Sequence, residues 1–294
     1  MTATVREGWN WLAAAPRHVR GVRLLRIGLG LALVIRAVTE WRWAAVTWGP
    51  SGWALPDSAV VPRIGALAEV FSSDARVYAA LAVVGGAGAL LVWGRAPRVA
   101  ALAALIPYWL LFNRTDLYGD GGDNLIRILL VYSLLLSDPR RRPGPMETWF
   151  HNLGVVLVLA QACLVYLSSG LAKASGQGWL DGTAVFVAAQ DELLFGDAAR
   201  AALRVPAVAV AATYGVLLME MWYPVAIFSR MRRPFLVGVM VFHGLTVLEM
   251  GIVSFGVVMI AMNLFVLMAD SGQSAWPIPA TKLERPSPGA PLSV

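Results

Sequence analysis

Charged side chains are scarce in this sequence: Asp, Glu, Lys and Arg make up 14% of its 294 residues. A soluble domain usually carries about a quarter charged residues. The deficit excludes a fold whose whole surface faces water, but it is expected of segments that cross the hydrocarbon core of a membrane. Hydrophobic residues make up 58% of the chain, and it holds 12 Trp, a residue enriched at membrane interfaces. The composition therefore predicts an integral membrane protein.

Cysteine and histidine are also rare. The single cysteine, Cys163, lies within an apolar run, which excludes an internal disulfide framework and a CxxC metal or redox site. Three histidines leave few ligands for a metal or haem, so we expect no metal site. The sequence also lacks a phosphate-cradling Gly-Lys motif, a paired-histidine metal motif and a Gly-x-Ser-x-Gly nucleophile elbow.

The formal net charge of +6 does not indicate a nucleic-acid-binding protein. The charges lie in short clusters between apolar runs, so no soluble domain exists to carry a basic face. Lys and Arg are concentrated in the segments that would be cytoplasmic if the N-terminus lies inside, as positive-inside topology requires. We therefore expect a multi-pass protein of the plasma membrane, in contact with lipid, with both termini in the cytoplasm.

Long apolar runs define the expected architecture, an all-α polytopic bundle of about eight transmembrane helices. The runs lie at 24–40, 77–94, 98–113, 124–137, 152–173, 206–228, 235–250 and 252–269. The last two nearly merge at Gly251, and one long helix there would give seven spans. Three regions follow: a basic interfacial segment at 1–22, the helical domain at 23–270, and a Pro-, Ser- and Gly-rich tail at 271–294, predicted to be disordered and cytoplasmic.

Polar residues gather where this topology places the outer half of the membrane. Charge inside a span costs about 2.5–3.5 kcal/mol by insertion scales, so such residues usually face protein or water. Lys173, His243 and Glu249 lie in or near this outer half, and they predict an outward-opening polar cavity. Asp123 and Arg127 are four residues apart, a spacing that favours a structural ion pair.

Each of these residues also has a purely structural interpretation. Lys173 could extend its amine to the outer interface, and His243 could bridge helices by a hydrogen bond. Glu220 is expected to pack or pair in the inner half, away from the cluster. Tyr166, Ser169 and Lys173 share a helix face, as do His243 and Thr246, so one pocket could be lined by both faces.

Three stretches, taken together, resemble a known family. They are Tyr166-Leu-Ser-Ser-Gly-Leu-Ala-Lys173 with Trp179-Leu-Asp-Gly182; Phe242-His243 with Gly251-Ile-Val-Ser-Phe255 and Asn263-Leu-Phe265; and Asn113 through Tyr118-Gly119. Their order and spacing are similar to those in the membrane domain of the vitamin K-dependent gamma-carboxylases. The bacterial relatives of that domain are called HTTM proteins and include the sporulation-delaying protein B group. The resemblance covers roughly residues 20–270.

The resemblance implies roles for particular residues. Lys173 matches the family lysine proposed as the base that starts vitamin K oxygenation, and His243 matches the histidine of the Phe-His motif. An amine in a partly dry pocket loses solvation of its charged form, which makes it a usable base. Vitamin K hydroquinone or another quinol is the implied cofactor. Residues expected to bind substrate or cofactor are Tyr166, Ser169, Trp179, Arg114, Asp123, Arg127, Thr246 and Glu249.

Two departures from the family pattern bear on activity. Arg114 stands where the carboxylases have a histidine, and the large lumenal domain that binds their protein substrate has no counterpart here. We therefore expect an outward-facing enzyme that acts on a peptide or lipid substrate with a quinone-like cofactor, rather than a complete glutamate carboxylase. Two alternatives stay open. One is a non-catalytic maturation or export factor for a secreted peptide, which would need a partner membrane or secreted chain. The other is a DoxX-like quinone oxidoreductase subunit.

Overall fold

The computed structural model describes residues 10–52, 72–113, 119–138, 140–192 and 194–268, and these residues are all-helical apart from turns and short connections. The long helices are α2 (Val19–Trp41), α5 (Asp74–Trp93), α6 (Pro97–Phe112), α7 (Gly121–Leu135), α8 (Pro145–Ala174), α12 (Pro206–Ala226), α13 (Arg232–Met250) and α14 (Val253–Leu267). Shorter helices are α3 (Ala44–Trp48), α9 (Gln177–Leu180), α10 (Ala184–Ala188) and α11 (Asp197–Leu203).

Sequence signals explain where several helices begin and end. Proline occupies the first turn of α6, α8 and α12, where its missing N–H costs no hydrogen bond. A capping box of Asp120 and Asp123 opens α7. Gly251 ends α13 with a left-handed φ of 68°, which glycine adopts without strain. The last two apolar runs are therefore two separate helices rather than one.

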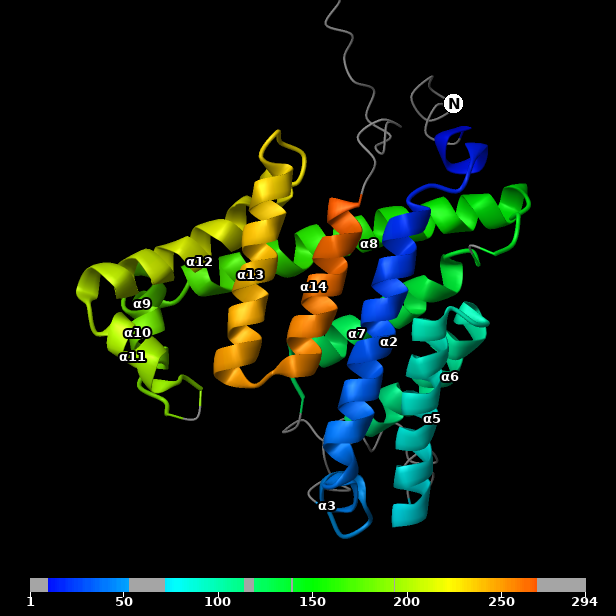
Figure 1. The fold of residues 1–294 in the computed structure, drawn as a ribbon, viewed down its shortest axis with the longest axis horizontal. Helices are drawn as coiled ribbons and strands as arrows, with labels where there is room; N and C mark the ends of the chain where they lie inside the picture. Colours follow the sequence, from blue (N-terminus) through cyan, green and yellow to red (C-terminus); the bar gives the residue numbers. More distant parts are fainter. Residues whose placement is uncertain (1–9, 53–71, 114–118, 139, 193, 269–294) are drawn as a thin grey trace, which may run out of the picture.

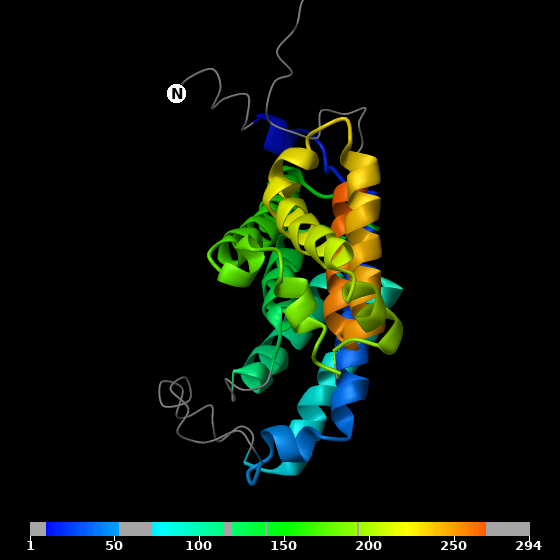
Figure 2. The ribbon, with the colours of Figure 1, turned by 90° about the vertical axis from the view of Figure 1, so that its left-hand side faces the viewer.

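Helix α2 lies at the centre of one half of the bundle, between α5 and α14 (Figure 1). Glycines allow this close approach: a Cβ placed on Gly30 would lie 2.5 Å from the carbonyl oxygen of Gly88 on α5. Small residues of this kind are the usual means of close packing between membrane helices. Figures 1 and 2 show α2, α14 and α13 side by side, whereas α8 runs across them and α12 slopes away from α13 on the side opposite α14.

One end of the bundle is held together by arginine side chains that donate to main-chain oxygens. Arg26 on α2 donates to the carbonyls of Leu136 and Ser137 at the end of α7, each at 2.9 Å. Arg98 at the start of α6 donates to Leu136 at 3.0 Å. Two further bonds, from Arg140 to Trp93 and from Arg232 to Leu267, join the ends of α5 and α14 to the same region. We call this the basic end.

The segment before α2 is fixed to the start of α8 at the basic end. The Asn152 amide donates to the carbonyls of Leu12 and Ala15 and accepts from the Arg17 N–H. His18 bonds the carbonyl of Phe265 at 2.7 Å, so the described chain begins and ends at one end of the fold (Figure 1, Figure 2). Helix α2 begins at Val19, inside the expected interfacial segment 1–22. The tail expected at 271–294 lies outside the described residues.

Four of the described helices are long and apolar enough to cross a membrane: α5, α8, α12 and α13. The chain is therefore a membrane protein by the length and composition of its helices. Helix α2 is as long, but Arg26, Arg36 and Glu40 interrupt its apolar run. Helices α6 and α14 are apolar but shorter, at 16 and 15 residues. The eight expected runs coincide with the eight long helices, while the number that actually span stays a prediction.

Candidate functional site

Lys173 and Glu220 form an ion pair between α8 and α12. The Lys173 Nζ lies 2.9 Å from each carboxylate oxygen of Glu220 and donates to the Ser169 hydroxyl at 2.6 Å. The side chains are 24% and 8% exposed, so the pair is shielded on the carboxylate side and reachable on the amine side. The Trp179 ring lies 5.4 Å from Nζ, within range of a cation–π contact.

A second polar group lies about two helical turns before Lys173 on α8. We call Tyr166, Tyr223, His243 and Asn263 the tyrosine–histidine network. The Tyr166 hydroxyl lies 2.7 Å from His243 Nε2, and the Asn263 amide donates to that hydroxyl at 2.6 Å. Tyr223 donates to the Asn263 carbonyl oxygen at 2.9 Å, and its ring stacks on Tyr166 at 3.9 Å between centroids. Four helices, α8, α12, α13 and α14, therefore meet at one buried network.

The hydrogen-bond pattern favours one tautomer of His243. Because Tyr166 accepts from Asn263, its own O–H is free to donate to His243 Nε2. The ring hydrogen then sits on Nδ1, an assignment that follows from the network. His243 is 2% exposed, and Nδ1 has no hydrogen-bond partner among the described residues. An unpaired buried donor is costly, which makes this nitrogen a candidate contact for a bound molecule.

The lysine pair and the network are linked through shared helix faces. Tyr166, Ser169 and Lys173 lie on one face of α8, as the spacing predicted, and Glu220 and Tyr223 lie three residues apart on α12. The expectation that Glu220 lies away from the cluster is wrong, because it is the direct partner of Lys173. A carboxylate deep in an apolar run needs a partner, and that rule alone could have linked it to the nearest unpaired cation.

A separate charged cluster lies between α2, α6 and α7. Arg36 Nη2 lies 2.6 Å from an Asp123 carboxylate oxygen and Nη1 lies 3.2 Å from Glu40. Tyr108 donates to the other Asp123 oxygen at 2.5 Å. Burial, and then repulsion from Asp123, raises the pKa of Asp120 above its ordinary value. We call Arg36, Glu40, Tyr108, Asp120 and Asp123 the arginine–aspartate cluster.

The expected ion pair between Asp123 and Arg127 is wrong. Arg36 from α2 takes the Asp123 carboxylate, whereas Arg127 donates to the Asp123 main-chain carbonyl at 3.3 Å and to the Asn113 side chain at 2.9 Å. Both carboxylate oxygens of Asp123 are occupied without Arg127: one accepts from Arg36 and from the Asp120 N–H of the capping box, and the other accepts from Tyr108.

Phe255 lies between the two clusters. Its ring makes an edge contact with His243 at 5.7 Å between centroids, and its Cα would lie 2.9 Å from a Cβ placed on Gly122 in the first turn of α7. The expected single polar cavity is thus divided into two polar groups, with an aromatic side chain between them.

The remaining predicted site residues lie elsewhere or outside the description. Thr246 donates to the His243 main-chain carbonyl of its own helix. Glu249 accepts from the Gly196 N–H, and so fixes the connection before α11 to the end of α13. Arg114 lies outside the described residues. Glu220, Tyr223 and Asn263 were not predicted to be site residues, although Asn263 stands in one of the motifs that carry the family resemblance.

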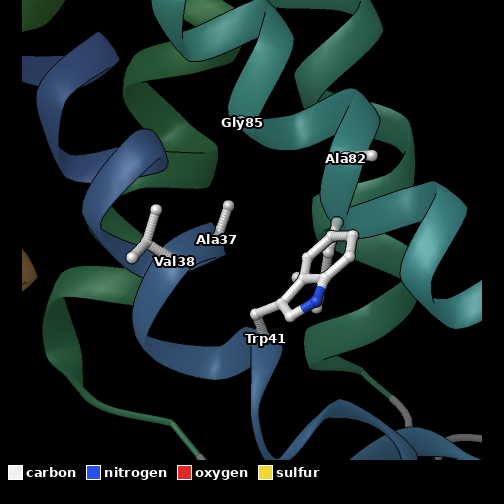
Figure 3. Close-up of a pocket in the computed structure, with 6 residues that line it drawn as sticks. Ala37, Val38, Trp41, Ala82 and Gly85 are labelled. Atoms are coloured by element: carbon white, nitrogen blue, oxygen red, sulfur yellow. The ribbon is translucent and has the colours of Figure 1, made fainter.

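Two grooves on the bundle are apolar. One, of about 350 Å³, lies between α2 and α5 and is lined by Ala37, Val38, Trp41, Leu81, Ala82 and Gly85 (Figure 3). These side chains offer no group for proton transfer. Among the described residues, no three His, Cys, Asp or Glu side chains come together in a way that could hold a metal ion.

Comparison with known proteins gives one partial likeness. No family model matches the chain, and no solved structure matches it. It is 29% identical over 159 residues to YitO of Bacillus subtilis (strain 168), which is described as an uncharacterized protein. The match covers 48% of this chain and 51% of that protein, so the chain spans about half the length of the relative.

Proposed function

We propose that the chain is an HTTM-type bacterial membrane enzyme with its catalytic centre at the Lys173–Glu220 pair. The observation that carries the proposal is this pair beside the tyrosine–histidine network, inside an apolar helix bundle. Ionisable residues within membrane helices are costly and commonly mark proton relays or substrate paths. Lys173 is the proposed base, and His243 is the proposed contact for a substrate or cofactor oxygen.

The pair can deliver a neutral amine without help from solvent. Movement of one proton from Lys173 Nζ to Glu220 converts an ammonium–carboxylate pair into an amine and a carboxylic acid. The neutral Nζ is then able to accept a proton from a group on its exposed side, while Glu220 stores the first proton.

A quinol is the cofactor that we propose for this site. His243 Nδ1 is a buried ring donor without a partner among the described residues, and it could hold a quinol oxygen. When bound, a quinol such as vitamin K hydroquinone supplies an acidic hydroxyl and reducing equivalents. His243 would orient that oxygen, and Lys173 would hold or move the proton. A peptide or lipid would be the substrate of the complete reaction.

We also propose that all eight long helices span the plasma membrane, the 30-residue α8 at a steep tilt, with both termini in the cytoplasm. The basic end gathers the starts of α2, α6, α8 and α13 and the ends of α5, α7 and α14. Helix direction alternates accordingly. The exposed Arg23, Arg142 and Arg230 belong to this end, which agrees with a cytoplasmic side rich in Lys and Arg.

Quinol oxidation by the purified protein in lipid nanodiscs tests the enzyme proposal. We expect reduced menaquinone to be oxidised in air faster with the wild type than with empty nanodiscs. Lys173→Ala should lose this excess rate. Ser168→Ala changes an exposed hydroxyl on the same helix and is the matched control, which should keep the rate. Equal rates for the wild type and Lys173→Ala would reject the proposal.

The alternative of a non-catalytic maturation or export factor is favoured by one observation. The Lys173 ammonium already has two partners inside the protein, the Ser169 hydroxyl and the Glu220 carboxylate. Such a factor would retain its biological effect in the double variant Lys173→Met/Glu220→Leu, and a membrane or secreted partner chain would co-purify with it. A DoxX-like oxidoreductase subunit would instead lose quinone turnover only when its partner subunit is removed.

A further inference from the structure

An open apolar groove separates α12 from α13. Its volume is about 500 Å³, and its walls include Trp222 on α12 and Phe235 on α13. Small-molecule sites usually have volumes of about 300–1,000 Å³. Figure 1 shows the origin of the groove: α12 leaves the turn that joins the two helices at a slant to α13.

Two glycines face this groove without a packing partner. Gly215 lines one wall and Gly238 the other, and a Cβ built on either meets no heavy atom within 4 Å. Elsewhere, as at Gly30 and Gly88, a glycine permits close contact between helices. Glycine weakens a helix interior relative to alanine. Gly86 and Gly244 also have open space around the Cβ position, but Gly215 and Gly238 differ from them in that both line this groove. They leave room for a molecule that is not part of the chain.

Positive charge lies at the end of the groove where the two helices join. Arg230 and Arg233 are exposed in that region, and Pro234, which follows Arg233, lines the groove. Among the described residues, neither arginine forms an ion pair. Arg232 differs, because it donates to the Leu267 carbonyl at 2.8 Å.

We infer that the groove binds an anionic phospholipid. One acyl chain would lie between α12 and α13, over Gly215 and Gly238, and the phosphate would lie near Arg230 and Arg233. Arginines at the ends of membrane helices attract anionic headgroups, and a lipid is the apolar molecule most abundant around such a groove. The site is separate from the Lys173–Glu220 pair, so it does not depend on the proposed chemistry.

Native mass spectrometry of the purified detergent-solubilised protein measures this binding. The probes are phosphatidylglycerol and phosphatidylcholine with identical acyl chains. Each arginine near the headgroup is worth about a fivefold change in affinity, so the wild type should prefer phosphatidylglycerol by about 30-fold. The double variant Arg230→Gln/Arg233→Gln should lose the preference. Arg142→Gln removes an exposed arginine from a different loop and should keep it.

Filling the groove tests the acyl-chain position. Gly238→Leu places a side chain in the groove and should weaken binding of both lipids by at least tenfold. Gly244→Leu is the matched control: it lies on the same helix, also has open space around its Cβ, and does not line the groove. Equal binding by Gly238→Leu and the wild type would overturn the inference. So would equal affinity of the wild type for the two lipids, or an adduct whose mass is that of a quinone or a second copy of the chain.

Discussion

Lys173 and Glu220 are 47 positions apart in the chain, yet the lysine Nζ lies 2.9 Å from both carboxylate oxygens. Removing either partner leaves a largely buried charge without compensation, whereas removing both leaves none. The pair therefore makes the polar centre of the fold depend on the contact between α8 and α12.

The free energies of unfolding of single and double variants should show the coupling between Lys173 and Glu220. Glu220→Gln or Lys173→Met alone should lower the free energy of unfolding by about 1–3 kcal/mol, because each leaves a buried group unsatisfied. The double variant Lys173→Met/Glu220→Gln should lose less than the sum of the two single losses. Thermal unfolding in detergent, followed by tryptophan fluorescence, measures all three. Strictly additive losses would show that the two side chains do not interact.

Replacement of Lys173 by arginine distinguishes a lysine that accepts a proton from one that only holds the helix end. Lys173→Arg keeps the charge next to Glu220, but a guanidinium stays protonated and cannot accept a proton. We expect Lys173→Arg to fold as stably as the wild type and to lose more than 90% of the quinol oxidation rate, since loss of one proton-transfer group costs about 10²–10⁴-fold. Full activity in this variant would mean that the lysine serves only to hold the helix end.

Replacements of Asp123 and of Arg127 should lower the free energy of unfolding by different amounts. Asp123→Asn breaks a buried contact with Arg36 and should cost about 3–5 kcal/mol. Arg127→Ala removes bonds to a main-chain carbonyl and to Asn113 and should cost about 1 kcal/mol. Chemical or thermal unfolding of the two variants gives the order directly. The reverse order would restore Arg127 as the main partner of this carboxylate.

Gly244 within α13 and Gly251 directly after it should respond to alanine in opposite directions. Gly251 has a φ of 68°, so Gly251→Ala should destabilise the protein by about 1 kcal/mol through backbone strain. Gly244 lies within the helix with open space around its Cβ, so Gly244→Ala should stabilise by about 0.5–1 kcal/mol. Shifts of the unfolding midpoint of opposite sign are expected. Shifts of the same sign would contradict the helix end at Gly251.

Reporter fusions should establish the orientation. A reporter active only in the cytoplasm should be active when fused after Arg142 or Arg233 and silent when fused after Asp120 or Gly196. Expression levels of each fusion, measured by immunoblot, are the control. The opposite pattern would place the basic end outside and would remove the basis for a cytoplasmic N-terminus.

The helices were predictable because the length of an apolar run and the glycine or proline residues that bound it are local properties of the sequence. The runs at 206–228 and 235–250, for example, became α12 and α13 with ends displaced by a few residues. Partner choice was not predictable. Spacing along one helix made Arg127 the obvious partner of Asp123, but Arg36 reaches that carboxylate from α2, and only the helix packing brings it there. The prediction for Glu220 was wrong for the same reason. The sequence of α8 or of α12 alone does not indicate that these two helices are in contact.

The contact of α2 with α14 bears on how the protein is assembled during synthesis. His18, directly before α2, bonds the carbonyl of Phe265, so the first long helix meets the last one. Helix α2 carries Arg26 and Arg36, and these two charges oppose its insertion into the membrane as a single helix. Its contact with α14 can form only after nearly the whole chain has been synthesised. A nascent chain stalled before residue 253 would therefore hold α2 without the helix that covers one of its sides.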